Sequence, residues 1–245
     1  MRRAFLWRGL CVAAVAVALV GAAWAGEAFE GKISFQVTAK QGGGQPMAIE
    51  YAVKKGIIRM EAKIPGMANY TLINPAEKKM TTVMPAQKMV MEMAIPDAKL
   101  PEGEVKPPEV TKTDKAEKVT FKADGTTLTL VKAGEDAGAG AKTFDGQQWQ
   151  LKQEKTTSEL WVAKDLTVLN SYLEMFKAMA QGPNAWMKKV EFPGFPYRIV
   201  TKDAEGNVQS EFALVSVDTK SPDDALFEIP ADFKKLEMPK MPAKE

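Results

Sequence analysis

Methionine is the residue type in this chain whose number and spacing could do chemistry. Seven of the 14 methionines lie between Met60 and Met93, and Met89, Met91 and Met93 alternate with other residues in one short stretch. Such thioethers can fill a core, can form an adaptable lining for variable apolar ligands, or can bind Cu(I), since soft ligands select soft metals. Side chains on one strand are held at sheet spacing, which weakens the metal interpretation relative to the other two.

The side chains that most enzymes use are scarce. The sequence has no histidine and one cysteine, Cys11, so histidine-based triads, thiol catalysis and the usual zinc sites have no residues to build them. The carboxylate pairs Glu135-Asp136 and Asp223-Asp224 lie in turn-like sequence, whereas catalytic carboxylates need burial or a partner that shifts their pKa. We therefore expect a protein that is not an enzyme, with no cofactor and no metal among its expected site residues.

Residues 1–25 have the features of an export signal. Three arginines precede an apolar run over 10–24, which is too short for a membrane-spanning helix. A small-residue motif then predicts cleavage between Ala25 and Gly26. Cys11 lies near the start of the apolar run and not at its end, which argues against lipid attachment. The expected product is periplasmic or secreted, is not a lipoprotein and has no stable membrane span.

The expected mature chain is nearly neutral. Removing three arginines from 33 basic residues leaves 30 against 31 acidic residues, and both signs are interspersed. This charge gives no case for nucleic acid as a partner. About 220 residues can close one core that buries roughly 70% of the extended chain's surface. We expect a single domain over 26–236 and a flexible tail at 237–245.

The methionines require a sheet to position them. Gly56 to Met93 contains four short runs of alternating apolar and polar residues, separated by turn signals. A period of 2 is typical of strands with one buried face, and short gaps make neighbouring strands antiparallel. Further strands are predicted over 29–39, 47–53, 119–122, 126–131, 149–153, 159–163, 197–202 and 208–217, with a short edge piece over 224–230.

Two stretches interrupt the strand pattern. Residues 94–118 carry four prolines and many charges, which predicts an excursion over the surface or rim of the sheet. Leu166 to Gln181 has apolar residues at steps of three and four, which predicts one helix that packs on the apolar face of the sheet. Its apolar stripe could be a movable lid over a pocket or ordinary packing.

Three segments resemble a known family: KKGIIRMEAKIPGMANYTLINPAEKKMTTVMPAQKMVMEM, FDGQQWQLKQEKTTSELWVAKDL, and FPYRIV followed at a distance by DDALFEIPADFKKL. Over most of residues 29–236 the chain is similar to the exported DUF4412 family, whose members resemble LolA/LolB-like lipoprotein carriers in fold. The resemblance implies a curved antiparallel half-barrel of about ten strands with one main helix covering the concave face. It assigns no functional residues, and Met89 stands where an aromatic residue is common.

These observations predict a mainly β (α+β) fold and a non-enzymatic binding or carrier protein. The expected partner is a lipid acyl chain or an apolar small molecule, held between sheet and helix. The alternatives are an envelope structural or interaction protein with a filled core, whose partner is another envelope protein, and a Cu(I)-binding protein. The side chains expected to line the apolar cavity are Ile58, Met60, Tyr70, Leu72, Met84, Met89, Met91, Met93, Leu169, Leu173, Phe176 and Met179.

Overall fold

The computed structural model describes residues 29–40, 44–64, 66, 68–95, 108–132, 134–153, 155–179 and 194–236, without the side chains of residues 168, 175, 176, 178 and 179. The described chain is mainly β. Its strands are β1 (Gly31–Ala39), β2 (Pro46–Lys54), β3 (Ile57–Lys63), β4 (Tyr70–Asn74), β5 (Lys79–Met84), β6 (Met89–Ala94), β7 (Glu109–Asp124), β8 (Thr127–Leu130), β9 (Lys142–Lys152), β10 (Thr156–Ala163), β11 (Phe195–Asp203), β12 (Val208–Asp218) and β13 (Lys234–Leu236).

The helical elements are short. They are α1 (Asn170–Met179) and the 3-10 turns η2 (Pro85–Gln87), η3 (Thr167–Leu169) and η5 (Asp224–Phe227). The helix predicted over 166–181 is therefore an α-helix that begins at residue 170, after a 3-10 turn, and residues 180 and 181 lie outside the described ranges. In the described part of the chain, no helix is both long and apolar enough to cross a membrane.

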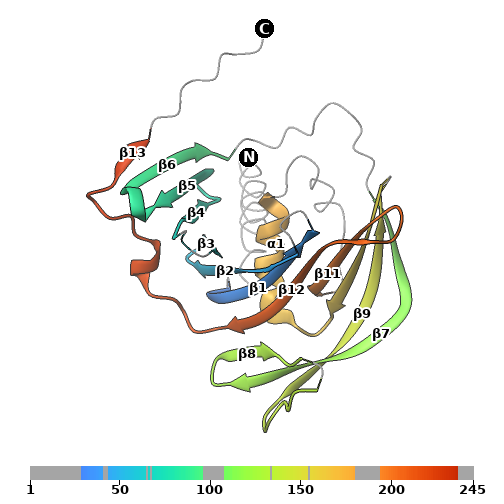
Figure 1. Ribbon diagram of the computed structural model, residues 1–245. Helices are drawn as coiled ribbons and strands as arrows, with labels where there is room; N and C mark the ends of the chain where they lie inside the picture. The colour runs from blue at the N-terminus through green and yellow to red at the C-terminus, as the bar shows by residue number, and fades with distance from the viewer. Residues whose placement is uncertain are drawn as a thin grey trace, which may run out of the picture.

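The thirteen strands of the described residues form one sheet, in place of the ten strands that were expected. Figure 1 shows how this sheet curves. Strands β1 to β6 are successive antiparallel neighbours, which confirms the predicted meander. On its other side β1 pairs with β12, which leads into the remaining strands. The short gaps between β1 and β6 enforce this order, because two strands joined by a tight turn pair with each other.

The second half of the sheet closes on itself. One edge of β12 pairs with β1, whereas the other edge pairs with β11 over residues 208–213 and with β8 over residues 216–218. Strands β10, β9 and β7 connect β11 to β8, so six strands form a closed circuit of hydrogen bonds beside the open meander. Closure pairs most of these strands on both edges, but β8 reaches only residues 121–124 of β7, so one edge of the first half of β7 has no described strand partner.

The prediction of a loop excursion over 94–118 is wrong from Glu109 onward. Residues 109–118 form the first half of β7, which pairs with β9, and residues 96–107 lie outside the described ranges. A register shift leaves residues 113–115 unpaired with β9, and the Gln147 amide donates hydrogen bonds to the carbonyls of Thr113 (2.6 Å) and Lys115 (2.9 Å) there. Charged side chains remain exposed on this half-strand, which is an ordinary feature of an edge.

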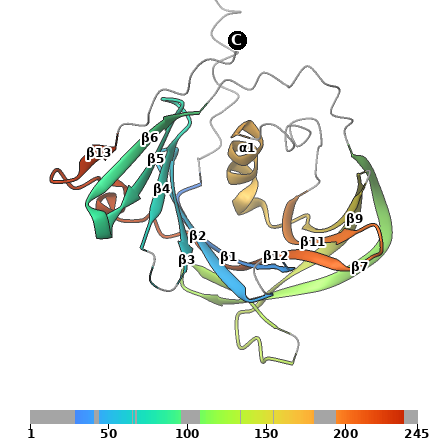
Figure 2. The ribbon, with the colours of Figure 1, turned by 45° about the horizontal axis from the view of Figure 1, so that its top comes forward.

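The main core lies where α1 meets strands β1, β2 and β11. The Tyr172 ring packs against Phe29, Tyr51 and Phe195, with ring centroids 6.4, 5.8 and 6.3 Å away. The backbone N–H of Phe29 also donates a 2.9 Å hydrogen bond to Ser171. Figure 2 shows α1 standing beside the curved sheet. Aromatic pairs in edge-to-face geometry favour this contact beyond their buried area.

The C-terminal strap, defined here as residues 221–236, runs along the side of β4–β6 that faces away from α1 (Figure 2). It includes η5, where an edge strand over 224–230 was expected, and ends in β13, which pairs in parallel with β6. The predicted tail at 237–245 lies outside the described ranges. The strap covers one face of the meander, which leaves the other face as the place to look for a site.

Candidate ligand-binding face

Apolar side chains gather on the face of β3–β6 that continues from the α1 core. Strand register places Ile58 opposite Ile73, Ile73 opposite Met80, and Met80 opposite Met93, so all four share this face. We call it the methionine face. Its members are Ile58, Met60, Ile73, Met80, Met84, Met89, Met91 and Met93.

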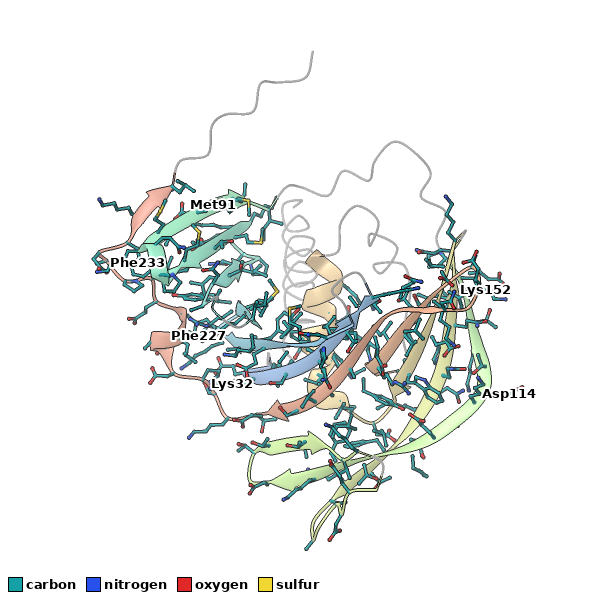
Figure 3. All side chains as sticks on the ribbon, in the orientation of Figure 1. Lys32, Met91, Asp114, Lys152, Phe227 and Phe233 are labelled. Atoms are coloured by element: carbon teal, nitrogen blue, oxygen red, sulfur yellow. The ribbon has the colours of Figure 1, made fainter. Side chains whose placement is uncertain are left out.

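Burial changes along the methionine face. Ile58 is 1% exposed and belongs to the main core, and Met60 and Ile73 pack against that core. The five methionines on β5 and β6 are partly exposed, and among the described residues none of them joins a buried cluster. Figure 3 marks Met91 on β6. The face therefore runs from closed packing at α1 to an accessible apolar surface at β6.

Two predicted lining residues, Tyr70 and Leu72, lie on the opposite face. Leu72 pairs with Arg59 and Tyr70 pairs with Glu61, so Leu72 and Tyr70 lie on the face that carries the charged side chains of β3. They form a second buried cluster with Val83 and Val90. The sequence shows which residues alternate within a strand, but the register between β3 and β4 decides which face each set joins.

The strap closes this second cluster. Phe227 and Phe233 pack against it, and both are labelled in Figure 3. The Arg59 guanidinium stacks 3.5 Å from the Tyr70 ring centroid and donates a 2.9 Å hydrogen bond to the Leu226 carbonyl. The cation–π contact with Tyr70 and the hydrogen bond to Leu226 together fix the Arg59 side chain between β4 and the strap.

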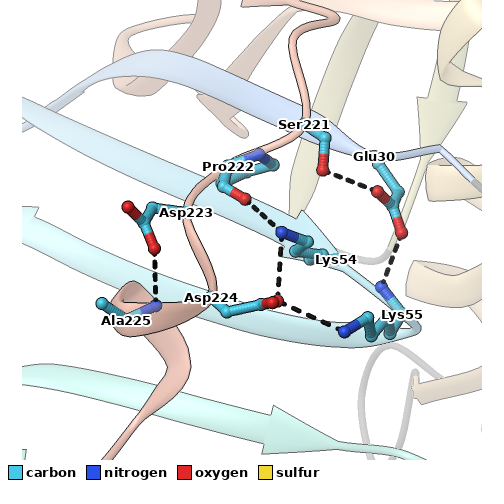
Figure 4. A network of polar contacts seen from close by, with 8 residues as sticks. All are labelled: Glu30, Lys54, Lys55, Ser221, Pro222, Asp223, Asp224 and Ala225. Atoms are coloured by element: carbon cyan, nitrogen blue, oxygen red, sulfur yellow. Dashed lines mark hydrogen bonds and ion pairs between the residues drawn. The ribbon is translucent and has the colours of Figure 1, made fainter.

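Polar contacts fasten the start of the strap to β2 (Figure 4). Lys54 Nζ donates to the Pro222 carbonyl (2.6 Å) and lies 3.0 Å from Asp224, which Lys55 also approaches at 3.4 Å. The hydrogen bond from Lys54 lowers the pKa of the Asp224 carboxyl. Ser221 donates to Glu30 and likewise lowers the pKa of that carboxyl.

The end of the strap is fastened in the same way. Lys88 forms a 2.7 Å ion pair with Asp232, and Lys235 pairs with Glu92, which Lys79 also contacts at 2.8 Å. These hydrogen bonds lower the pKa values of Asp232 and Glu92. With both ends of the strap held and its apolar side chains packed, Tyr70, Leu72, Val83 and Val90 are each at most 8% exposed.

Two of the four lining residues predicted for the helix lie in the main core, Leu169 from η3 and Leu173 from α1. Leu169 and Leu173 are 0% and 6% exposed and pack with Ile58 and Tyr51 in one cluster. The side chains of Phe176 and Met179 lie outside the description. Ile73 and Met80 belong to the methionine face but were missing from the lining predicted from the sequence. The alternation of Met80, Thr82 and Met84 could have identified Met80.

Two hollows lie outside the predicted lining. A cavity of about 330 Å³ lies at the β7–β8 hairpin, where Leu128, Phe144 and Leu166 meet Lys142 and Asp165. A polar groove of about 380 Å³ crosses the other side of β1–β3 and includes Lys32, Arg59 and Asp218 among its lining residues. Neither set has a sequence motif, because the topology brings together residues that are far apart in the chain.

The described residues contain no group of three or more His, Cys, Asp or Glu side chains that could hold a metal ion. Burial raises the pKa of the Tyr197 phenol, which donates a 2.7 Å hydrogen bond to Glu117. That tyrosine therefore stays protonated and acts as a structural donor rather than as a base.

Comparisons with known proteins give a family and two distant structures. Residues 29–233 match the model of DUF4412, a domain of unknown function. A search of curated proteins found no match. The chain is 12% identical to an uncharacterized conserved protein from Thermus thermophilus, with a TM-score of 0.46 and coverage of 91% of this chain and 98% of that one.

A LolA superfamily protein from Nitrosomonas europaea is also similar. It is 10% identical, with a TM-score of 0.34 and coverage of 82% of this chain and 89% of that chain. Both TM-scores lie below 0.5, so we draw neither architecture nor function from these two structures.

Proposed function

The chain belongs to the DUF4412 family, and we propose that it is a non-enzymatic protein that binds or carries a lipid or another apolar ligand. The observation that carries this proposal is the methionine face, where five thioether side chains of β5 and β6 remain partly exposed beside a closed core. In this proposal the sheet acts as a curved half-barrel and α1 covers its concave side. The ligand lies between the two.

The chemistry of the face suits a ligand of variable shape. Methionine is unbranched and has three rotatable bonds, so its side chain can repack around different apolar groups. Each methylene that moves from water onto the face contributes about 0.8 kcal/mol. A long acyl chain would therefore gain enough from burial to bind without a charged anchor.

The compartment is part of the same proposal. A carrier of this kind would work in the periplasm or outside the cell, after cleavage between Ala25 and Gly26, both of which lie outside the described residues. The expected chain would lack the leader and would not carry a lipid anchor of its own.

A second candidate is an envelope structural or interaction protein. The main core is closed by η3 and α1, since Leu169 and Leu173 are almost fully buried in it. If the remaining surface is occupied by another protein, the methionine face would be a contact surface and not a ligand site. Displacement of an apolar fluorescent dye by lipids separates the two candidates.

The test uses Met91→Lys, which puts a charge among the partly exposed methionines of β5 and β6, and a matched control. Val208→Lys makes the same kind of change at a 50% exposed strand position on β12, away from the face. We expect the dye to bind the wild-type protein and Val208→Lys and to be displaced by fatty acid or phospholipid, whereas Met91→Lys loses binding. Equal binding by both variants, or no binding by the wild-type protein, would overturn the carrier proposal.

A further inference from the structure

Strands β5 and β6 concentrate methionine on one face only. Met80 lies directly opposite Met93, Met84 lies opposite Met89, and Met91 lies opposite Thr82 between the two pairs. The other face of the same strands uses Val83 and Val90 for its apolar contacts. The soft sulfur donors of these two strands therefore lie together on one side of the sheet.

We propose that this cluster is a binding site for one Cu(I) ion. Cu(I) is a soft cation that accepts thioether sulfur, whereas Zn²⁺ and Cu(II) prefer imidazole, thiolate or harder oxygen and nitrogen donors. The sequence has no histidine. Five thioethers on two neighbouring strands are the donor set that this chain offers to a soft metal.

Sheet geometry brings three of these sulfurs within reach of one ion. Side chains directly opposite each other have Cβ atoms about 5 Å apart, and diagonal neighbours are about 7–8 Å apart. The three flexible bonds of each methionine can close the remaining distance. Met91 is the diagonal neighbour of both Met80 and Met84, so it completes a triad with either pair. Because the two triads share Met91, the cluster has room for one ion.

The surroundings favour soft-metal selectivity. The Glu92 carboxylate occupies the other face of β6, where Lys79 and Lys235 neutralise it. No hard anionic donor of β5 or β6 therefore competes at the thioether cluster. The methionines are partly exposed, so an ion can reach them from solution.

The experiment titrates the mature protein with Cu(I) under anaerobic, reducing conditions against a chromogenic Cu(I) chelator. We expect one ion per chain and no comparable uptake of Zn²⁺. Met91→Leu should weaken Cu(I) binding by at least roughly tenfold, because even outer-shell changes at metal sites cost about 10–100-fold. Met84→Leu alone should weaken it less, since Met80, Met91 and Met93 remain.

The control is Met47→Leu, a partly buried methionine on β2, which β3 and β4 separate from β5. Leucine preserves most of the apolar volume of methionine, so Met47→Leu, Met84→Leu and Met91→Leu should all retain the fold. Far-ultraviolet circular dichroism checks the fold. The proposal is overturned if the wild-type protein takes no Cu(I) from the chelator, or if Met47→Leu weakens binding as much as Met91→Leu does.

Discussion

The two faces of β3–β6 share one backbone but differ in what covers them. One face carries Tyr70, Leu72, Val83 and Val90 and is closed by the C-terminal strap. The methionine face carries flexible thioethers that stay partly exposed on β5 and β6. Branched and aromatic side chains suit a surface with one fixed partner, whereas unbranched methionine suits a surface with variable partners. Under the proposed function, the strap face serves stability and the methionine face is the one that binds the ligand.

The sharpest way to break this comparison is to place the same charge on each face in turn. Val83 is 0% exposed, and its neighbour Met84 on β5 points the opposite way. Val83→Asp should lower the free energy of unfolding by about 3–5 kcal/mol, because it buries an unpaired carboxylate. Met84→Asp should cost about 1 kcal/mol, since that position is partly exposed. Urea denaturation measures both, and equal losses would show that the two faces are equally closed.

A smaller effect is expected at the clamp between the sheet and the strap. Arg59→Met removes the stack on Tyr70 and the hydrogen bond to the Leu226 carbonyl, which together should cost about 1–2 kcal/mol. Lys63→Met is the control, because its pairs with Glu50 and Glu61 are exposed and worth less than about 1 kcal/mol. If the two variants unfold at the same urea concentration, the clamp contributes nothing beyond a surface ion pair.

The smallest effect concerns pH. Lysine partners lower the pKa values of Asp224, Asp232 and Glu92 from their ordinary 3.8, 3.8 and 4.5. A lowered carboxyl pKa stabilises the fold at pH values above the ordinary pKa, and this stability is lost as the pH falls through the lowered value. Attachment of the strap should therefore weaken only below about pH 4.

Denaturation midpoints between pH 6 and pH 2.5 test this dependence. The variant Glu92→Gln/Asp224→Asn/Asp232→Asn lacks the three titrating carboxyls, so its midpoint should fall less steeply than that of the wild-type protein. Dye binding at the methionine face should not follow the same curve, because the strap lies on the other side of the sheet. Parallel pH curves for the two proteins would contradict the assigned role of these ion pairs.

The sequence predicted local features well. The period-2 runs located β1 to β6, and the sharing of one face by Met89, Met91 and Met93 follows from alternation alone. The helical stripe placed Leu169 and Leu173 against the sheet, where both are buried. Each of these features depends on residues that are close in the chain.

Features that depend on distant residues were missed. Tyr70 and Leu72 were assigned to the methionine face, because alternation within β4 does not reveal its register with β3. The strap over β4–β6 joins segments about 150 residues apart, such as Glu228 with Tyr70, and no local pattern signals that contact. The charged residues and prolines of 94–118 led to the prediction of a loop where the first half of β7 lies. A strand at an edge can keep its charged side chains in water, so such residues do not exclude a strand.

Native mass spectrometry of the mature protein, purified from a periplasm without detergent, tests the central claim that the methionine face holds an apolar ligand. Spectra are recorded before and after organic extraction, for the wild-type protein and for Met91→Lys. The account predicts a discrete added mass on the wild-type protein that extraction removes and that Met91→Lys lacks while remaining folded. A bare wild-type mass, together with no uptake from a panel of lipids, would contradict the claim and identify the methionines as packing or as a contact surface.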